Sequence, residues 1–306
     1  MSYHPPRVYH LSGSVGACGS NNPDDVKAIQ QMVNQAGYHL ASGRSVRVSG
    51  QCDGQTLEAI IWYQRLLNMS PSGLVQPVDT WFMQALKNAL EPHWRPRHTA
   101  GPLRVREGQI TFDAEGLDYI TAAEPFRQPL HLQQFSRILH WPGGNSGVTI
   151  GRGYDMKDRS AGKILTEIKL AGIEEYKAVI CSKAAGLYGR EAAQFVSVYG
   201  RLIGEITHVQ QIRLFDISYT EKVQYAKGVY MRGSSRIENR VLWEDIDIKI
   251  RETFVDVIYQ GISGISALIK VIATGGGRDD IIRYIETDPR QTVYPERLRV
   301  KIRNLR

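Results

Sequence analysis

The sequence of 306 residues contains only three cysteines, Cys18, Cys52 and Cys181. Three scattered cysteines are too few for a metal cluster, and an odd number cannot form a fully paired disulfide framework. One bridge, such as Cys18–Cys52, is an open alternative, but free thiols in a protein made in the cytosol are favoured. We therefore expect each domain to be held together by its own hydrophobic core.

Long apolar runs are also missing. The longest candidate, residues 262–273, is interrupted by Ser, Gly and Lys, whereas a membrane span needs roughly 18 to 20 apolar residues. The first residues, MSYHPPRVYHLSG, have no cationic start followed by an apolar stretch, so we predict no secretory signal. The hydrophobic content of 42% and charged content of 23% are ordinary for a soluble globular protein, and the length predicts two domains.

The net charge of +7 is spread along the chain, apart from the C-terminal stretch PERLRVKIRNLR. A mild positive balance suits any polyanion, nucleic acid and the bacterial wall included, so it does not identify a partner. In the C-terminal stretch the spacing of Leu298, Ile302 and Leu305 predicts one apolar helical face with solvated arginines around it.

Three amphipathic helices are predicted in the first third of the chain. Residues 1–20 are rich in Gly, Ser and His, show no periodicity and are interpreted as a loose arm. The first helix begins at residues 23–25, where an acidic pair meets the positive end of the helix dipole, and Gly37 ends it. A polar loop over residues 40–54 precedes the second helix, and the third begins at Pro77 or Asp79.

The order of motifs in these helices resembles the peptidoglycan-binding domain family. The matching stretches are VKAIQQMVNQAGY, DGQTLEAIIWYQRLLNM and SGLVQPVDTWFMQAL. In that family an Asp-Gly precedes a Thr-led helix that ends in an aromatic-Gln pair, here Tyr63-Gln64, and a Gly-Leu-Val turn precedes a Thr-Trp helix, here Thr80-Trp81. The resemblance implies a three-helix domain over residues 21–92 whose partner is peptidoglycan. The long loop before Asp53, and Ser72-Gly73 in place of a second Asp-Gly, leave its ligand contacts open.

A linker is predicted at residues 93–104, because the overlapping stretch EPHWRPRHTAGP, residues 91–102, combines three prolines with mixed charge and no periodicity. The rest of the chain, residues 105–306, is interpreted as one further domain. Its first stretch, QITFDAEG, alternates like a short strand, and LDYITAAEPF predicts a helix that ends near Glu124, before Pro125.

The most informative stretch is SGVTIGRGYDM, residues 146–156. Its glycines allow tight turns that other residues resist. They alternate with the β-branched Val148, Thr149 and Ile150, which predicts a small twisted hairpin that ends on Tyr154-Asp155. The Gly-Arg-Gly within it matches neither of the glycine patterns that hold phosphates, so nucleotide binding is not expected.

This hairpin resembles that of the phage-type lysozyme superfamily, in its pesticin-like branch. There, a Thr-Ile-Gly-x-Gly element lies opposite a catalytic Glu at the end of a helix. RETFVDVIYQG resembles the core helix of that family, and PERLRVKIRNL resembles its closing helix. The resemblance implies a mostly helical α+β fold, with a lysozyme-like domain made of a small β-hairpin sheet and a helical lobe. It also implies that Glu124 is the catalytic acid, that Asp155 is the base and that Thr149 orients a water.

Cleavage of a glycosidic bond requires two carboxyl groups, one of which must stay protonated. Glu124, close in sequence to Phe126 and Trp141, is a candidate for the protonated group, and Asp155 on a polar turn is a candidate for the ionised one. The acid of the family is often followed by Gly, which makes Glu115-Gly116 the alternative. Glu124 is preferred because it lies at a helix end and closer to the hairpin.

Other chemistries find less support. His140, with Ser136 and Ser146 nearby, lacks the GxSxG turn of a hydrolase triad. His131 and His140 have no companion Cys and no HExxH motif, so neither a metal nor another cofactor is expected.

The resulting prediction is a muramidase that hydrolyses the β-1,4 bond between N-acetylmuramic acid and N-acetylglucosamine. Made in the cytoplasm without a signal, it would act in the periplasm or cell wall of a target bacterium, either as a phage lysin or as an antibacterial toxin such as a type VI secretion effector. A toxin implies an immunity protein and a secretion carrier as further partners. The alternative is a non-catalytic wall-binding component of a phage tail or secretion spike.

Overall fold

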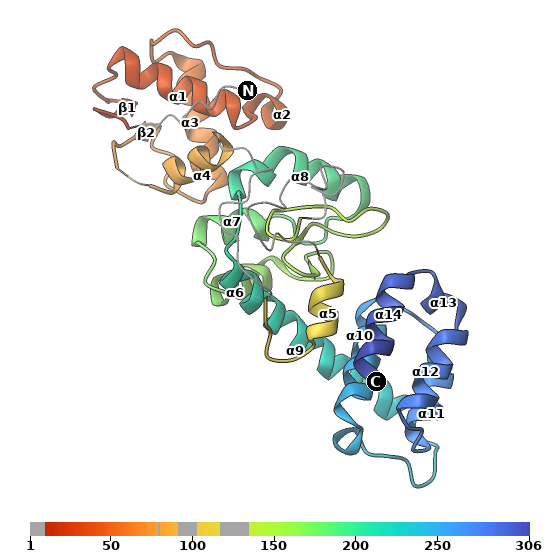
Figure 1. Ribbon diagram of the computed structural model, residues 1–306. Coiled ribbons are helices and arrows are strands. Elements are labelled where there is room, and N and C mark those ends of the chain that lie inside the picture. Colours follow the sequence, from red (N-terminus) through yellow and green to blue (C-terminus); the bar gives the residue numbers. More distant parts are fainter. Residues whose placement is uncertain (1–9, 79, 91–102, 117–134) are drawn as a thin grey trace. The chain divides into compact units, whose positions relative to one another are not determined.

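A computed structural model describes residues 10–78, 80–90, 103–116 and 135–306. The protein is mostly helical, with two small antiparallel sheets (Figure 1). The chain divides into two compact units, an N-terminal unit of Met1–Pro102 and Leu117–Leu214 and a C-terminal unit of Leu103–Gly116 and Phe215–Arg306. This division differs from the single boundary expected at residues 93–104, because residues 103–116 pack with the C-terminal helices.

The N-terminal unit contains two strand pairs and seven helices in the part of the chain that is described. Its elements are β1 (Val15–Gly16), α1 (Pro23–Gln35), α2 (Tyr38–Ser42), α3 (Gly54–Leu66), β2 (Leu74–Val75), α4 (Trp81–Leu90), β3 (Thr149–Ile150), β4 (Tyr154–Asp155), α6 (Ala161–Leu170), α7 (Glu175–Ser182) and α8 (Gly189–Ile203). Helix α9 (His208–Gly233) begins in this unit and ends in the next. The C-terminal unit adds α5 (Gln109–Ala114), the 3-10 helix η2 (Trp243–Asp245), α10 (Ile248–Tyr259), α11 (Ser266–Ala273), α12 (Arg278–Thr287), α13 (Pro289–Thr292) and α14 (Pro295–Leu305).

The predicted three-helix domain is formed by α1, α3 and α4, whose apolar faces meet in one core. Gly37, at φ +87°, ends α1 in a conformation that disfavours other residues. Gln64 explains the aromatic-Gln motif, because its side chain accepts from Gly73 N–H (2.9 Å) and donates to the Leu74 carbonyl (2.9 Å). The buried residues of this core include Val26, Ile29, Met32, Val33, Ile60, Tyr63, Phe82 and Leu86.

The segment of residues 10–20, expected to belong to a loose arm, packs onto this domain instead. Val15 is fully buried, and β1 pairs with β2 in an antiparallel sheet. The carboxylate of Asp25 accepts hydrogen bonds from Ser12 N–H (2.9 Å) and Gly13 N–H (2.9 Å). Asp25 therefore anchors the preceding chain, a role beyond the helix-dipole effect expected of it.

The long loop after α1 is also held in place by a buried side chain. Gln30 accepts from the backbone N–H groups of Ser49 (2.9 Å) and Gly50 (3.0 Å). Its amide donates to the Gln51 carbonyl (2.9 Å) and to the Thr56 hydroxyl (2.9 Å). The loop expected to be irregular also contains the short helix α2. The inserted residues are thus part of the folded domain.

Replacing Gln30 by Leu is expected to lower the free energy of unfolding by about 3 kcal/mol, because several buried polar groups lose their partners together. Urea unfolding followed by circular dichroism measures this. Gln35→Leu, at an exposed position of the same helix, is the matched control and is expected to change stability by less than about 0.5 kcal/mol. Equal effects of the two substitutions would contradict the role given to Gln30.

Helix α4 packs against α7 and α8 within the N-terminal unit. Asn88 of α4 donates to the Tyr176 hydroxyl and to the Leu202 carbonyl (3.3 Å). The rings of Trp62 and Tyr199 are stacked with their centroids 6.5 Å apart. The three-helix domain and the region that carries β3 and β4 therefore share an interface made of side chains from both.

The QITFDAEG segment is a helix, α5, and the expectation of a strand was wrong. Gly108, at φ +73°, precedes its first turn. The ring of Phe112 packs edge-on against that of Phe215, with centroids 5.1 Å apart. Packing of this short segment against α10 and α14 decides its conformation, which local alternation does not reveal.

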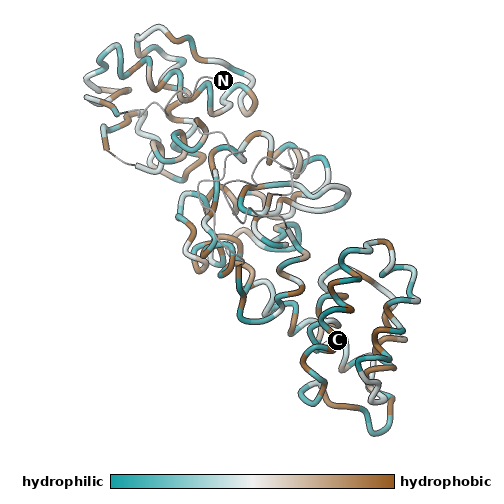
Figure 2. Tube along the Cα trace, viewed as in Figure 1, coloured by the Kyte–Doolittle hydropathy of each residue, from teal (hydrophilic) through white to brown (hydrophobic). Residues whose placement is uncertain are grey.

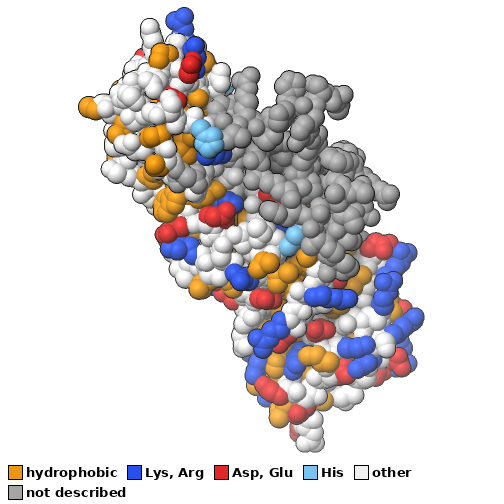
Figure 3. All heavy atoms as spheres, turned by 60° about the vertical axis from the view of Figure 1, so that its left-hand side comes forward, with side chains coloured by type: hydrophobic (Ala, Val, Ile, Leu, Met, Phe, Trp, Pro, Cys, Tyr) orange, Lys and Arg blue, Asp and Glu red, His pale blue; other side chains and the backbone are white. Residues whose placement is uncertain are grey.

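The C-terminal unit is a bundle of helices in which α10, α12 and α14 contact one another. Figure 2 shows apolar residues along the sides on which these helices face each other. On the face of this bundle seen in Figure 3, basic and acidic side chains are interspersed, with no broad area of one sign. None of the described helices combines the length and apolarity that crossing a membrane requires.

Candidate active site

The predicted hairpin is confirmed by β3 and β4, which pair antiparallel with Thr149 opposite Asp155 and Ile150 opposite Tyr154. Gly151 (φ +65°) and Gly153 (φ +80°) form the turn between them. Both angles lie in the left-handed region, so the Gly-Arg-Gly of the sequence is explained by the turn itself.

Three residues form a row across this small sheet. His140 and Thr149 exchange both backbone hydrogen bonds, at 2.9 and 2.8 Å, and Thr149 in turn lies opposite Asp155. Residues directly opposite each other in antiparallel strands project from the same face. The side chains of His140, Thr149 and Asp155 therefore share one face of the sheet.

The carboxylate of Asp155 is fixed by two backbone N–H groups. Gly147 N–H donates to one oxygen (3.0 Å) and Lys157 N–H to the other (2.8 Å). A Cβ on Gly147 would lie 2.2 Å from the Asp155 oxygen, so only glycine allows this approach. Because each oxygen has a further lone pair, the half-buried carboxylate can still accept a proton or hold a water.

Thr149, in contrast, is buried, and its hydroxyl donates to the Gly147 carbonyl (3.3 Å). Its oxygen is still free to accept a hydrogen bond. Thr149 thus lies opposite Asp155 in the hairpin. Its hydroxyl supports the backbone at Gly147, the residue that holds the Asp155 carboxylate.

A buried network holds the second strand in place. The Tyr154 hydroxyl donates to Glu167 (2.6 Å), which also forms an ion pair with Arg159 (2.8 Å). The Arg159 guanidinium lies 4.4 Å from the centre of the Tyr154 ring and donates to the Asp155 carbonyl (3.1 Å). Burial raises the pKa of Tyr154 above its usual value, so this hydroxyl remains a donor. These contacts hold the backbone of Asp155 rigid.

His140 is the residue of this row that the sequence analysis did not place in the site. Burial lowers its pKa below the ordinary 6.5, an effect that the Ile138 carbonyl and Asp155 oppose. Its Nδ1 lies 2.9 Å from that carbonyl. No local pattern signals the pairing of His140 with Thr149, because the two residues are separated by an irregular loop.

The lowered pKa of His140 predicts a pH effect on stability. Protonation is easier in the unfolded chain, so the free energy of unfolding should fall as the pH drops below about 6.5 and level off below the pKa of the folded state. Urea unfolding at a series of pH values measures this slope. His140→Asn should reduce it, whereas His39→Asn, at an exposed position, should leave it unchanged. An identical slope in both variants would contradict the assignment.

The structure describes only one of the two candidate acids. Glu124, preferred from the sequence, lies outside the described residues. Glu115 lies in the C-terminal unit, where its carboxylate forms an ion pair with Arg297 (2.7 Å). Burial raises the pKa of Glu115, and Arg297 only partly offsets this. Glu115 is thus engaged by Arg297, and it belongs to a different unit of the chain from Asp155.

Glu115 belongs to a buried cluster of charges. Arg297 also pairs with Asp256 (2.7 Å), and the Lys301 ammonium lies 3.3 Å from the same carboxylate. Lys301 donates further to Gln260 (2.8 Å) and is almost fully buried. The expectation of solvated arginines on the C-terminal helix was therefore wrong for Arg297, whose side chain is 15% exposed. Arg297 and Lys301 turn inward because Glu115 and Asp256 balance their charges.

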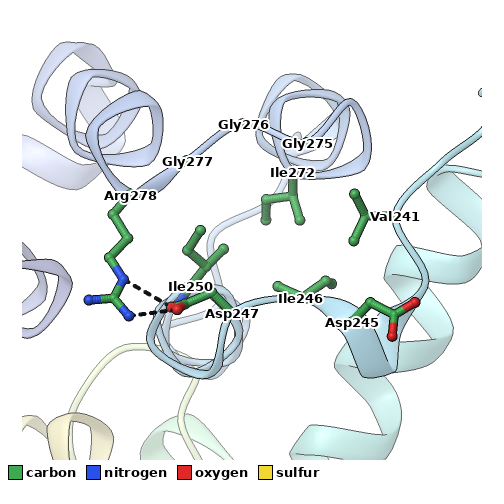
Figure 4. A pocket seen from close by; sticks show the side chains of 10 residues that line it. All are labelled: Val241, Asp245, Ile246, Asp247, Ile250, Ile272, Gly275, Gly276, Gly277 and Arg278. Carbon is green, nitrogen blue, oxygen red and sulfur yellow. Dashed lines mark hydrogen bonds and ion pairs between the residues drawn. The ribbon is translucent and has the colours of Figure 1, made fainter.

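A pocket of about 290 Å³ lies elsewhere in the C-terminal unit (Figure 4). Val241, Ile246, Ile250 and Ile272 give it apolar walls. At one edge Asp247 pairs with Arg278 (2.6 Å) and caps α10 through Lys249 N–H (3.0 Å). The Asp247 carboxylate is thus occupied by structural contacts, and this pocket is not a candidate active site.

The three cysteines are free thiols, and burial raises the pKa of the Cys181 thiol to about 12. No group of His, Cys, Asp and Glu side chains suited to a metal ion is found among the described residues.

Two family models match the sequence. "Putative peptidoglycan binding domain" matches residues 22–90, which supports a peptidoglycan-binding domain over the three helices and associates the chain with the cell wall. "Domain of unknown function (DUF8812)" matches residues 108–265, more than half of the chain. The chain belongs to the DUF8812 family. The DUF8812 match includes α5, the whole row of His140, Thr149 and Asp155, and α10. No sequence among the curated proteins matches the chain.

Proposed function

We propose that the protein is a muramidase, a peptidoglycan hydrolase that cleaves the β-1,4 bond between N-acetylmuramic acid and N-acetylglucosamine. The observation that carries this proposal is the fixed carboxylate of Asp155, which lies opposite Thr149 in a glycine-dependent hairpin. The peptidoglycan-binding domain in the same chain brings such a site to its polymer. The proposal assigns Asp155 to the ionised role and a glutamate to the protonated one.

Each described residue has a definite task in this mechanism. Asp155 accepts a proton from an attacking water, or faces the positive charge that develops on the sugar ring. Thr149 and Gly147 hold that carboxylate and its surroundings in one geometry. The acid protonates the leaving oxygen. We assign this role to Glu124, as the family resemblance implies, and keep Glu115 as the alternative to be separated by substitution.

The test is incubation of purified sacculi with the full chain, followed by identification of the soluble fragments. New reducing ends on muramic acid are the expected result. Release of peptides without new reducing ends would point to an amidase and overturn the proposal, as would reducing ends on glucosamine alone.

A second candidate is a wall-binding protein without activity, such as a component of a phage tail or secretion spike. The observation that favours it is that both oxygens of Asp155 accept backbone N–H groups, as in a purely structural turn. Sacculi that bind the chain but yield no soluble fragments would support this candidate.

The place of action is part of the proposal. A phage lysin or an antibacterial toxin delivered by a secretion system would meet the wall in the periplasm of a target cell. A toxin would also need a carrier and an immunity protein. Growth arrest on periplasmic, but not cytoplasmic, expression in a bacterium tests this.

A further inference from the structure

An exposed aromatic ring lies close to Asp155 in the N-terminal unit. Tyr188, just before α8, is 52% exposed. Its backbone forms an antiparallel bridge with Gly147, the residue whose N–H holds one oxygen of Asp155. Tyr188 is thus placed next to the candidate carboxylate by the loop that fixes it.

A lysine lies beside this ring. The backbone N–H of Lys157 holds the other oxygen of Asp155, and its ammonium lies 5.4 Å from the centre of the Tyr188 ring. The ammonium donates to the Asn145 carbonyl (3.2 Å) and forms no ion pair with any described carboxylate. Its charge is therefore available to an incoming anion.

The loop that carries these groups is well braced. Trp141 donates through its indole N–H to the Ser146 carbonyl (3.1 Å), and Gly189 N–H donates to the same oxygen (3.1 Å). The backbone next to Tyr188 is therefore fixed before any ligand arrives, which reduces the entropy lost on binding.

We infer that Lys157 and Tyr188 form a subsite for a sugar that bears a carboxylate, and this inference rests on the proposed function. The ring of Tyr188 provides a flat surface for the apolar face of a pyranose. Lys157 provides a charge-assisted hydrogen bond to the carboxylate. In peptidoglycan that sugar is muramic acid, whose negative charge comes from its lactyl group when free or from the attached peptide. The subsite would select peptidoglycan over a neutral polymer of N-acetylglucosamine.

The test measures binding by the full chain in an Asp155→Asn background, so that turnover does not interfere. Three soluble ligands of equal glycan length are compared: peptidoglycan fragments with peptides, the same strands stripped of peptides by an amidase, and chitin oligosaccharides. Lys157→Met should weaken binding of a carboxylate-bearing ligand about tenfold and leave chitin unchanged. Tyr188→Ala should weaken all three. Lys169→Met, a lysine on α6 that pairs with Glu175 (2.7 Å), is the matched control.

The pattern of affinity loss in Lys157→Met identifies the carboxylate that the subsite binds. A loss confined to peptide-bearing fragments identifies the peptide carboxylate as the ligand, and a loss confined to stripped strands identifies the lactyl carboxylate. Unchanged binding of all three ligands by Lys157→Met overturns the subsite. If wild-type protein releases no reducing ends yet Lys157→Met still loses affinity, the muramidase proposal fails and the subsite stands.

Discussion

Asp155→Asn is expected to slow the release of reducing ends from sacculi by roughly 10²- to 10⁴-fold. The amide keeps the size of the side chain but cannot carry the negative charge that the reaction needs. One amide oxygen still accepts a backbone N–H, so the hairpin should persist. Release of reducing ends over time, with equal protein loading on equal sacculi, measures the effect.

The matched control is Asp158→Asn, since Asp158 is an exposed carboxylate three residues away. It should retain wild-type activity. Thermal unfolding of both variants separates loss of chemistry from loss of fold, and sedimentation with sacculi should show unchanged binding through residues 22–90. Wild-type turnover by Asp155→Asn would remove this residue from the mechanism.

Glu124→Gln is the second substitution from which we expect a large effect, again roughly 10²- to 10⁴-fold on cleavage. The reason is that an amide cannot give a proton to the leaving oxygen, which the proposed mechanism requires of this glutamate. Wild-type activity should decline as the pH rises through the pKa of the acid.

Glu115→Gln is measured in parallel, because Glu115-Gly116 is the alternative that the sequence left open. Full activity in Glu124→Gln and loss in Glu115→Gln would assign the acid to Glu115. The reverse result would assign it to Glu124 and leave Glu115 as a structural partner of Arg297. A merely structural effect of Glu115→Gln would lower the unfolding temperature without changing the shape of the pH profile.

The features that the sequence predicted well are those encoded locally. Helices α1, α3 and α4 follow from apolar spacing and from Gly37, and the β3–β4 hairpin follows from Gly151 and Gly153 within a β-branched run. Each of these signals acts within a few residues of its own position. The order of motifs then extended the prediction to the peptidoglycan-binding domain, which the family match supports.

The features that were missed depend on partners far along the chain. β1 pairs with a strand about sixty residues later, and α5 is a helix because Phe112 packs against Phe215. Arg297 and Lys301 are buried only because Asp256 and Glu115 meet them there. His140 joins the row through backbone bonds to Thr149 alone. Periodicity carries no information about such pairings.

Neither of the two compact units is one continuous segment of the chain. The chain passes from one unit to the other after Pro102, Gly116 and Leu214, so α5 is separated in sequence from the C-terminal helices with which it packs. A truncation after Leu214 would leave Ile110 and Phe112 without those helices, and a fragment that starts at Phe215 would lack α5 altogether. To exchange the C-terminal unit between two proteins, residues 103–116 and residues 215–306 would have to be replaced together. Joining one gene segment to the end of another cannot do this.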